Sequence, residues 1–413
     1  MFRLGAVLGG RAAAAGRRTL FTTGGGLSGG GWRAPVAAVV AGAGIAMVGF
    51  TGYSMLFGAG SVYPSEVRGL LREAGMAYMR PADKQDLPAA AERYAAALAL
   101  LDRLGERDAA HARDAAHVTG LVARLAAVYT EMGDLDRAIG AHLDLLRRIL
   151  GDAGMRDAKT QVAQLMDPAL PADRRQNILR ALGCANALAQ AYEARARRSR
   201  RRGAVLAGAR AAASADMREA GRWYQWCLQL TMLTYQNHHD HAQLEQGRPL
   251  GTAPSFDPRT LPRVFSVEIV TSLFYNAAAF FAASGQPDLA GPLLLRALDL
   301  LRRGADGTEA AVCRSSVLMS HLANAAVAAG DLPAAEQWAI DGLALARRLP
   351  ASAECVDSFV ALTYGLGAVY EAAARPGPAR VQYRTALDAA RAVGDDAAAE
   401  LARAALARVP GAI

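Results

Sequence analysis

The chain has 413 residues, which is too long for one small module and suits either two or three domains or one extended repeat array. Aromatic residues make up only 6% of the chain, while alanine, glycine and arginine are abundant. This composition favours helices and argues against a β-sandwich or a barrel. The four cysteines are too widely spaced for a zinc ribbon, a CxxC redox motif or a disulfide scaffold.

The formal net charge of +8 is concentrated in two places. No acidic residue occurs before Glu66, and a second basic cluster lies in the middle of the chain. The rest of the chain is acidic overall, so we do not expect a general nucleic-acid-binding surface. The arginines in question are Arg3, Arg11, Arg17, Arg18 and Arg33, and then Arg195, Arg197, Arg198, Arg200, Arg201 and Arg202.

The first 34 residues have the composition of a mitochondrial transit peptide, rich in Arg, Ala, Gly, Ser and Thr and free of acid. Residues 35–58 follow without a charge and are long enough to cross a bilayer as one helix. The arginines lie before this span, so the positive-inside rule places the short N-terminal part in the matrix. We therefore predict a single-pass protein of the mitochondrial inner membrane whose large C-terminal domain faces the intermembrane space.

The remainder, residues 63–413, repeats a tetratricopeptide-like pattern in which L-G-x2-Y is followed by a small residue and then an aromatic or large residue. The clearest copy uses Leu366, Gly367, Tyr370, Ala379 and Tyr383. Small residues let two antiparallel helices approach, and bulky ones fill the space between them. The sequence therefore predicts an all-α, tetratricopeptide-like solenoid of helical hairpins after one transmembrane helix. The predicted repeats lie near 71–104, 119–150, 182–235 with an insertion, 271–304, 316–349 and 360–393, followed by a capping helix at 395–408.

Signals for catalysis and for cofactors are weak throughout the chain. Neither of the two lysines, Lys84 and Lys159, follows the glycine of a phosphate loop, which excludes a Walker ATPase. The run from His238 to His241 is predicted to be a solvated helix end rather than a metal site. Trp223, Tyr224 and Trp226 are predicted to pack in the core. We expect no catalytic residues, no metal, no cofactor, no nucleic acid and no small-molecule substrate.

In repeats of this type the first helix of each hairpin lines a concave groove that binds segments of other proteins. Amide side chains can pair with the backbone of an extended chain, and aromatic side chains offer apolar contact area. An alternative is that some of these amides cap or bridge neighbouring helices. The predicted groove residues are Arg124, Asn186, Gln190, Tyr275, Asn276, His321, Asn324 and Tyr364.

The central arginine cluster is expected in the turn of the third hairpin. Two interpretations are open: a solvated insertion, or a contact between anionic lipid headgroups and Arg197, Arg198, Arg200 and Arg201. Cys313 and Cys355 precede neighbouring repeats at similar phase. An oxidising compartment would permit a disulfide between them, but we expect buried thiols.

Three stretches resemble the fungal mitochondrial genome-required (Mgr-type) TPR adaptors of the inner-membrane i-AAA protease. Tyr63–Leu104 carries YPSEVRGLLREA and AAAERYAAALALLDRLG, Cys313–Ala325 reads CRSSVLMSHLANA, and the likeness returns in Glu354–Gly394. The resemblance implies a non-catalytic adaptor that binds unfolded or surplus inner-membrane proteins and presents them to the i-AAA complex in protein quality control. The other function we consider is an assembly factor for a respiratory-chain complex, which would share the anchor and the repeats.

Overall fold

The computed structural model describes residues 62–80, 85–108, 112, 114–154, 157–167, 172–202, 207–245, 258–262, 265–304, 308–349 and 352–409. All regular elements within these ranges are helices, as the composition predicts. The chain divides into two compact units, and the boundary falls inside one long helix, at Leu233 and Thr234. We refer to them as the N-terminal unit and the C-terminal unit.

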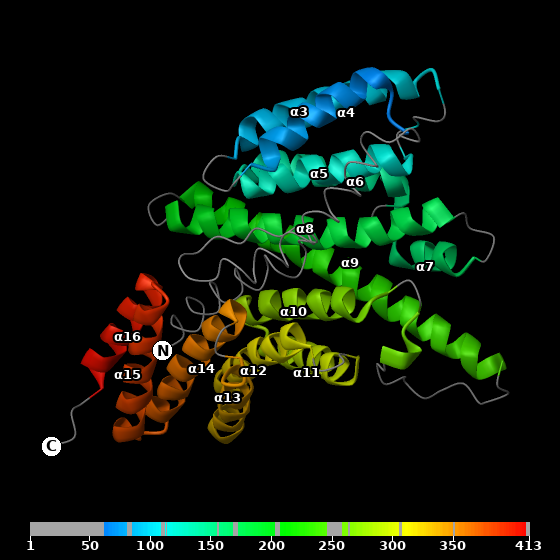
Figure 1. Cartoon of the computed structure of the whole chain (residues 1–413). Coiled ribbons are helices and arrows are strands. Elements are labelled where there is room, and N and C mark those ends of the chain that lie inside the picture. Colours follow the sequence, from blue (N-terminus) through cyan, green and yellow to red (C-terminus); the bar gives the residue numbers. More distant parts are fainter. Residues whose placement is uncertain are drawn as a thin grey trace. The chain divides into compact units, whose positions relative to one another are not determined.

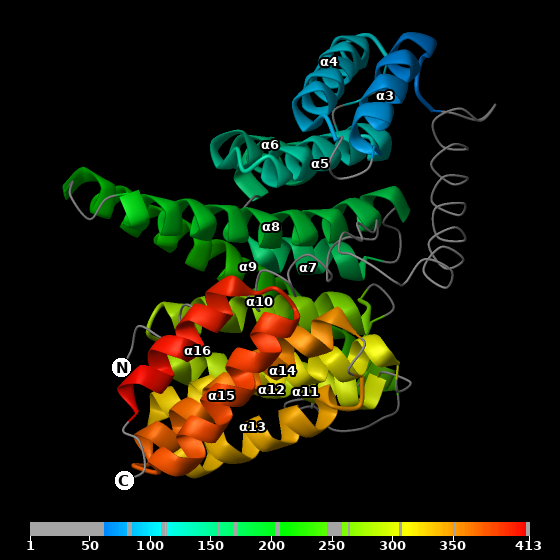
Figure 2. The same cartoon turned by 60° about the vertical axis from the view of Figure 1, so that its left-hand side comes forward.

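The N-terminal unit is built from helical pairs that follow one another along the chain (Figures 1 and 2). Helix α3 packs on α4, α5 packs on α6, and α8 packs on α6 and contacts α7. Hydrogen bonds join α8 to α9, including one from the Cys227 thiol to the Leu182 carbonyl (3.7 Å). The bounds are α3 Ser65–Tyr78, α4 Leu87–Gly105, α5 Ala116–Glu131, α6 Leu135–Gly154, α7 Ala158–Met166, α8 Ala172–Arg202 and α9 Ala207–Glu245.

The C-terminal unit is also built from helical hairpins, and none of its helices is as long as α8 or α9 (Figure 1). Each helix packs on the next, so that α10–α11, α12–α13 and α14–α15 form hairpins and α16 covers α15. First helices of neighbouring hairpins also touch, most extensively α12 and α14. The bounds are α10 Val267–Ala283, α11 Pro287–Gly304, α12 Glu309–Ala329, α13 Leu332–Ala346, α14 Ala353–Ala372, α15 Pro376–Ala392 and α16 Asp396–Arg408, with a short 3-10 turn at Pro258–Thr260 before them.

A recurring Gly-Asp turn reverses the chain between the two helices of a hairpin. Gly330 ends α12 in the left-handed region (φ 82°), which costs a residue without Cβ little. The next residue, Asp331, caps α13 by accepting a hydrogen bond from the backbone N–H of Ala334 (3.0 Å). Gly133 (φ 71°) and Asp134 make the same turn between α5 and α6. The local sequence therefore encodes the reversals directly.

Glycines also determine how closely helices approach, as the repeat pattern predicts. A Cβ on Gly367 of α14 would lie 2.8 Å from the ring carbons Cδ1 and Cε1 of Tyr383 on α15. A Cβ on Gly342 of α13 would lie 2.9 Å from a methyl group of Leu362. Both separations are below van der Waals contact, so a larger residue at either position would force the neighbouring side chain to move.

Two expectations for the third predicted repeat need correction. The arginine cluster was expected in a turn, but α8 continues as a helix to Arg202. Glu193 and Ala196, which lie in this part of α8, are fully buried, so α8 is already held by packing where the cluster begins. An additional short helix, α7, precedes α8 and was not expected.

No helix in the described ranges is both long enough and apolar enough to cross a membrane. The predicted transit peptide at 1–34 and the predicted span at 35–58 lie outside the described residues. The mitochondrial, inner-membrane and topology predictions therefore remain predictions from the sequence.

Candidate protein-binding surface

The first helix of the second C-terminal hairpin, α12, presents polar side chains from its last two turns. Asn324 is exposed and His321 is half-buried, three residues apart and hence on one face of the helix. The Tyr275 hydroxyl of α10 lies 3.1 Å from His321 Nε2, and the two rings meet edge to face. This contact fixes the imidazole against the neighbouring hairpin. The exposed amide of Asn324 beside this fixed imidazole offers hydrogen bonds to a bound chain.

Two predicted groove residues of the N-terminal unit are also accessible. Arg124 on α5 is exposed, and its guanidinium lies over the Tyr78 ring at 4.1 Å. Gln190 on α8 is half-buried and occupies the same register as Asn324, directly after the Leu-Ala pair of its repeat. The same repeat position therefore carries an amide on a first helix of each unit.

The other four predicted groove residues are buried. Their exposed fractions are 1% for Asn276, 2% for Asn186 and Tyr275, and 3% for Tyr364. Side chains this deeply enclosed contribute to packing between helices, which is the alternative that the sequence left open for the amides. Tyr364 illustrates this, since its ring packs on Tyr383 with centroids 5.2 Å apart. The accessible residues among those predicted are therefore Arg124 and Gln190 in the N-terminal unit and His321 and Asn324 in the C-terminal unit.

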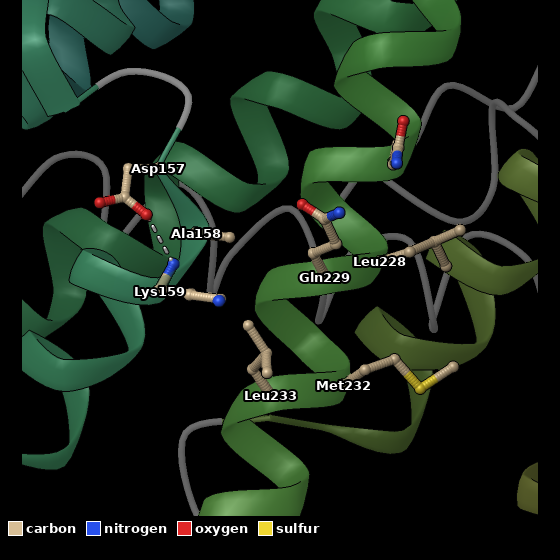
Figure 3. A pocket seen from close by; sticks show the side chains of 8 residues that line it. Asp157, Ala158, Lys159, Leu228, Gln229, Met232 and Leu233 are labelled. Atoms are coloured by element: carbon tan, nitrogen blue, oxygen red, sulfur yellow. Dashed lines mark hydrogen bonds between the residues drawn. The ribbon is translucent and has the colours of Figure 1, made fainter.

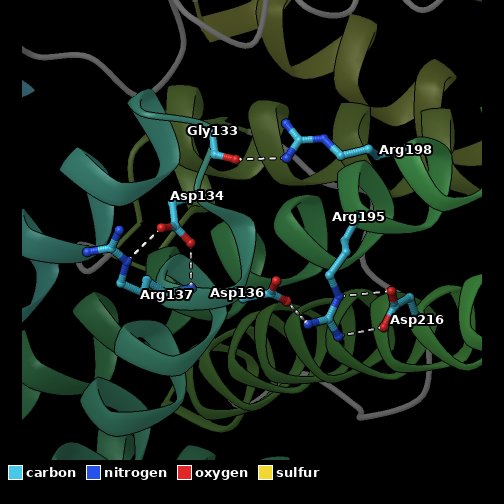
Figure 4. Close-up of polar contacts among 7 residues, drawn as sticks. All are labelled: Gly133, Asp134, Asp136, Arg137, Arg195, Arg198 and Asp216. Atoms are coloured by element: carbon cyan, nitrogen blue, oxygen red, sulfur yellow. Dashed lines mark hydrogen bonds and ion pairs between the residues drawn. The ribbon is translucent and has the colours of Figure 1, made fainter. Parts of the chain in front are cut away.

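Arg195 and Arg198 of α8 have partners inside the chain (Figure 4). Arg195 makes a two-pronged ion pair with Asp216 of α9 (2.7 and 2.9 Å) and a further bond to Asp136 (2.6 Å). These acidic partners raise the pKa of the Arg195 guanidinium. The arrangement ties α8 to α9 and α6.

Two candidate lipid contacts belong to this group. Arg197 pairs with the fully buried carboxylate of Glu193, and Arg198 donates to the Gly133 carbonyl (3.0 Å). Anionic headgroups would have to compete with these partners. The side chains of Arg200 and Arg201 lie outside the described residues, so a lipid contact there stays a prediction.

A hollow of about 530 Å³ opens beside α7 and α9 in the N-terminal unit (Figure 3). Gln225 and Gln229 bring amides to it, Leu228, Met232 and Leu233 bring apolar surface, and Lys159 brings an ammonium group from the start of α7. Sequence reasoning missed this place. The signal that could have found it is the pair of glutamines one helical turn apart among apolar residues on α9.

The aromatic residues of α9 are buried, as the packing interpretation predicts. Trp223, Tyr224 and Trp226 are 2%, 0% and 4% exposed, and the two indole rings meet at 70° with centroids 6.1 Å apart. They form part of the core and offer no stacking platform.

A buried histidine and cysteine lie between α6 and α8. The Cys184 sulfur is 3.3 Å from both Nδ1 and the carbonyl oxygen of His142. Burial lowers the pKa of His142 to about 4 and raises that of the Cys184 thiol. A neutral imidazole and a protonated thiol make a packed pair and no nucleophile, because a reactive cysteine needs thiolate character and access.

This histidine predicts a specific loss of stability in acid. Between pH about 4 and about 6.5 the unfolded chain binds a proton at His142 that the folded chain does not. The free energy of unfolding should therefore fall as the pH drops through this window. We expect a His142→Leu variant to lose less stability than the parent between pH 7 and pH 5. Near pH 5 the slopes of the free energy of unfolding against pH should differ by about 1 kcal/mol per pH unit between the two proteins. Urea unfolding at several pH values measures the slope, and parallel slopes in the two proteins would refute the assignment.

Cys313 and Cys355 form a disulfide, which corrects the expectation of buried thiols. Both residues are buried, as expected, with exposed fractions of 1% and 0%. They lie at similar phase on α12 and α14, two first helices that pack directly on each other. This packing brings the Cα atoms to 4.8 Å, which is within the range that a disulfide needs.

Comparison with known proteins leaves the family open. No family model matches the chain, and no curated protein matches it. Among solved structures, BtubC (BKLC) from P. vanneervenii is 15% identical, covering 79% of this chain and 95% of that one, with a TM-score of 0.45. A circular tandem repeat protein is 14% identical over 83% and 88%, with a TM-score of 0.21, and yeast Tom70 is 11% identical over 83% and 96%, with a TM-score of 0.16. Likenesses this distant add no argument, so the description as an array of helical hairpins rests on the packing of the chain itself.

Proposed function

We propose that this chain is a non-catalytic adaptor of the mitochondrial inner membrane, which binds unfolded or surplus membrane proteins and presents them to the i-AAA protease. The observation that carries the binding role is the pair His321 and Asn324 on one face of a first helix. Imidazole and amide groups hydrogen-bond to a polypeptide backbone whatever its sequence, which suits a binder of unfolded chains.

The architecture supports a protein partner in a second way. Consecutive hairpins contact mainly their neighbours, so their first helices form an extended surface within each unit rather than one enclosed pocket. Near the end of α10 the ring of Phe281 is half-buried, and it meets the buried Phe280 ring edge to face with centroids 5.6 Å apart. Partly accessible aromatic area of this kind is typical of protein-binding surfaces.

The membrane and protease parts of the proposal come from the sequence. The acid-free leader, the uncharged stretch at 35–58 and the arginines before it support an inner-membrane anchor with the hairpins in the intermembrane space. The i-AAA partner comes from the resemblance of Tyr63–Leu104, Cys313–Ala325 and Glu354–Gly394 to the Mgr-type adaptors.

A paired set of variants tests the binding surface. His321→Ala/Asn324→Ala should weaken capture of a permanently unfolded, carboxymethylated test protein by about tenfold, the effect of losing one well-placed contact cluster. The control is Gln337→Ala/Asp341→Ala, which removes an exposed hydrogen bond from α13 of the same hairpin. Circular dichroism should show the same helicity in all three proteins. Equal capture by both double variants would overturn the role of α12. The single variant Asn324→Ala keeps the Tyr275–His321 bond, so a loss of capture in this variant comes from the missing amide and not from that bond.

The protease itself is tested by purifying the tagged full chain from gently solubilised mitochondria and identifying the proteins that accompany it. Recovery of the AAA protease supports the adaptor role. Recovery of respiratory-complex subunits without the protease would replace it with the assembly-factor role.

A further inference from the structure

The disulfide Cys313–Cys355 connects two consecutive hairpins rather than the two helices of one hairpin. It joins α12 to α14, and 42 residues separate the two cysteines along the chain. Helix α12 also carries His321 and Asn324, which lie two to three turns further along. The cross-link therefore fixes the helix that presents the candidate surface against its neighbour.

The helix contact around this disulfide is made of small polar side chains. The hydroxyl groups of Ser316 and Ser358, one turn beyond each cysteine, are 2.8 Å apart and both buried. Ser316 also donates to the Gly342 carbonyl at 3.0 Å, which ties α13 into the same contact. Thiolates and oxidants must reach a sulfur atom to react with it, and the folded packing leaves both sulfurs enclosed.

The remaining two cysteines belong to the other unit. Cys184 and Cys227 belong to the N-terminal unit, where both are buried and lie against backbone carbonyls of His142 and Leu182. The sequence from Thr234 to the end contains no cysteine other than Cys313 and Cys355. Each therefore has a single intramolecular partner within its unit.

We propose that the C-terminal unit is completed by an oxidation step and matures in an oxidising compartment. In this step the thiols of Cys313 and Cys355 exchange with the disulfide of a thiol–disulfide oxidoreductase. The Cys313–Cys355 bond forms, the donor disulfide breaks, and two electrons and two protons pass to the donor, which leaves as a dithiol. The exchange precedes the closure of α12 on α14, because closure encloses both sulfurs. The proposal concerns maturation and holds for an adaptor and for an assembly factor alike.

Counting thiols in the full-length protein tests the proposal. Cells that make the tagged chain from its own leader are quenched in acid, and the chain is denatured and treated with a maleimide before and after reduction. We expect two adducts before reduction and four after it, with a cross-linked peptide pair that contains Cys313 and Cys355. Four adducts before reduction would overturn the proposal, as would a cross-linked pair containing Cys184 and Cys227.

Two controls make the count specific. A Cys184→Ser/Cys227→Ser variant should give no adduct before reduction and two after it, whereas Cys313→Ser should give three adducts in both conditions. Dithiothreitol added to the native protein should leave the bond intact unless denaturant is present. Rapid reduction of the native protein would show that the two sulfur atoms are accessible, and it would refute the conclusion that oxidation precedes the closure of α12 on α14. None of these readouts uses client binding, so failure here is distinct from failure of the proposed function.

Discussion

Replacing Tyr383 with alanine is expected to destabilise the C-terminal unit by about 3–5 kcal/mol, the usual cost of removing a fully buried aromatic side chain. Tyr383 is 0% exposed, its ring fills the space that Gly367 leaves open, and it packs on Tyr364. Removing the ring leaves a cavity that neighbouring helices cannot close without moving. Urea unfolding followed by circular dichroism measures the loss.

A conservative variant separates the ring from its hydroxyl group. The Tyr383 hydroxyl donates to Glu371 Oε2 at 2.6 Å, and burial next to this carboxylate raises the pKa of the tyrosine. Tyr383→Phe keeps the ring and should cost about 1–3 kcal/mol, because a hydrogen bond to a charged group is lost. A phenylalanine variant as unstable as the alanine variant would show that the hydroxyl, and not the packing, dominates.

Replacing Arg195 with alanine is expected to destabilise the N-terminal unit by about 2–4 kcal/mol. The variant leaves the Asp216 carboxylate, whose side chain is 10% exposed, without its cation. An unpaired charge in such a position costs more than the intact pair contributes. A third of Arg195 is exposed, which places the expected loss below that of a fully enclosed pair. Urea unfolding measures this loss as well.

The same region offers a matched control (Figure 4). Arg137 pairs with Asp134 at 2.6 Å on the surface of α6, with 60% of its side chain exposed, so Arg137→Ala should leave the stability almost unchanged. Arg195→Ala/Asp216→Asn should recover part of the loss, since the stranded charge is removed with its partner. An Arg195→Ala variant no less stable than Arg137→Ala would show that water replaces the guanidinium at no cost.

The helical class and the chain reversals could be predicted from the sequence because short-range rules govern them. A glycine that accepts a positive φ followed by an aspartate that caps the next helix marks a turn wherever it occurs, as at Gly330–Asp331. Small and large residues at fixed spacing, such as Gly367 and Tyr383, determine how the two helices of one hairpin pack. None of these signals depends on distant parts of the chain.

The depth of individual side chains could not be predicted in the same way. The repeat pattern places Ala277–Ala278 of α10 and Leu322–Ala323 of α12 at corresponding positions. Asn276 precedes the first pair and is 1% exposed, whereas Asn324 follows the second pair and is exposed to solvent. The difference depends on how neighbouring hairpins cover each helix. The disulfide was missed for a related reason, since only the packing of α12 on α14 shows that Cys313 and Cys355 face each other.

Helices α8 and α9 have 31 and 39 residues, whereas α5 has 16. At 1.5 Å per residue, α8 is about 46 Å long and α5 about 24 Å long. The hairpin of α8 and α9 is therefore much longer than the hairpin before it. A linear array tolerates this because each hairpin's stability depends on its own fold and on the two contacts beside it. For protein engineering, the length of a single hairpin is therefore a variable that can be changed without redesigning the rest of the array.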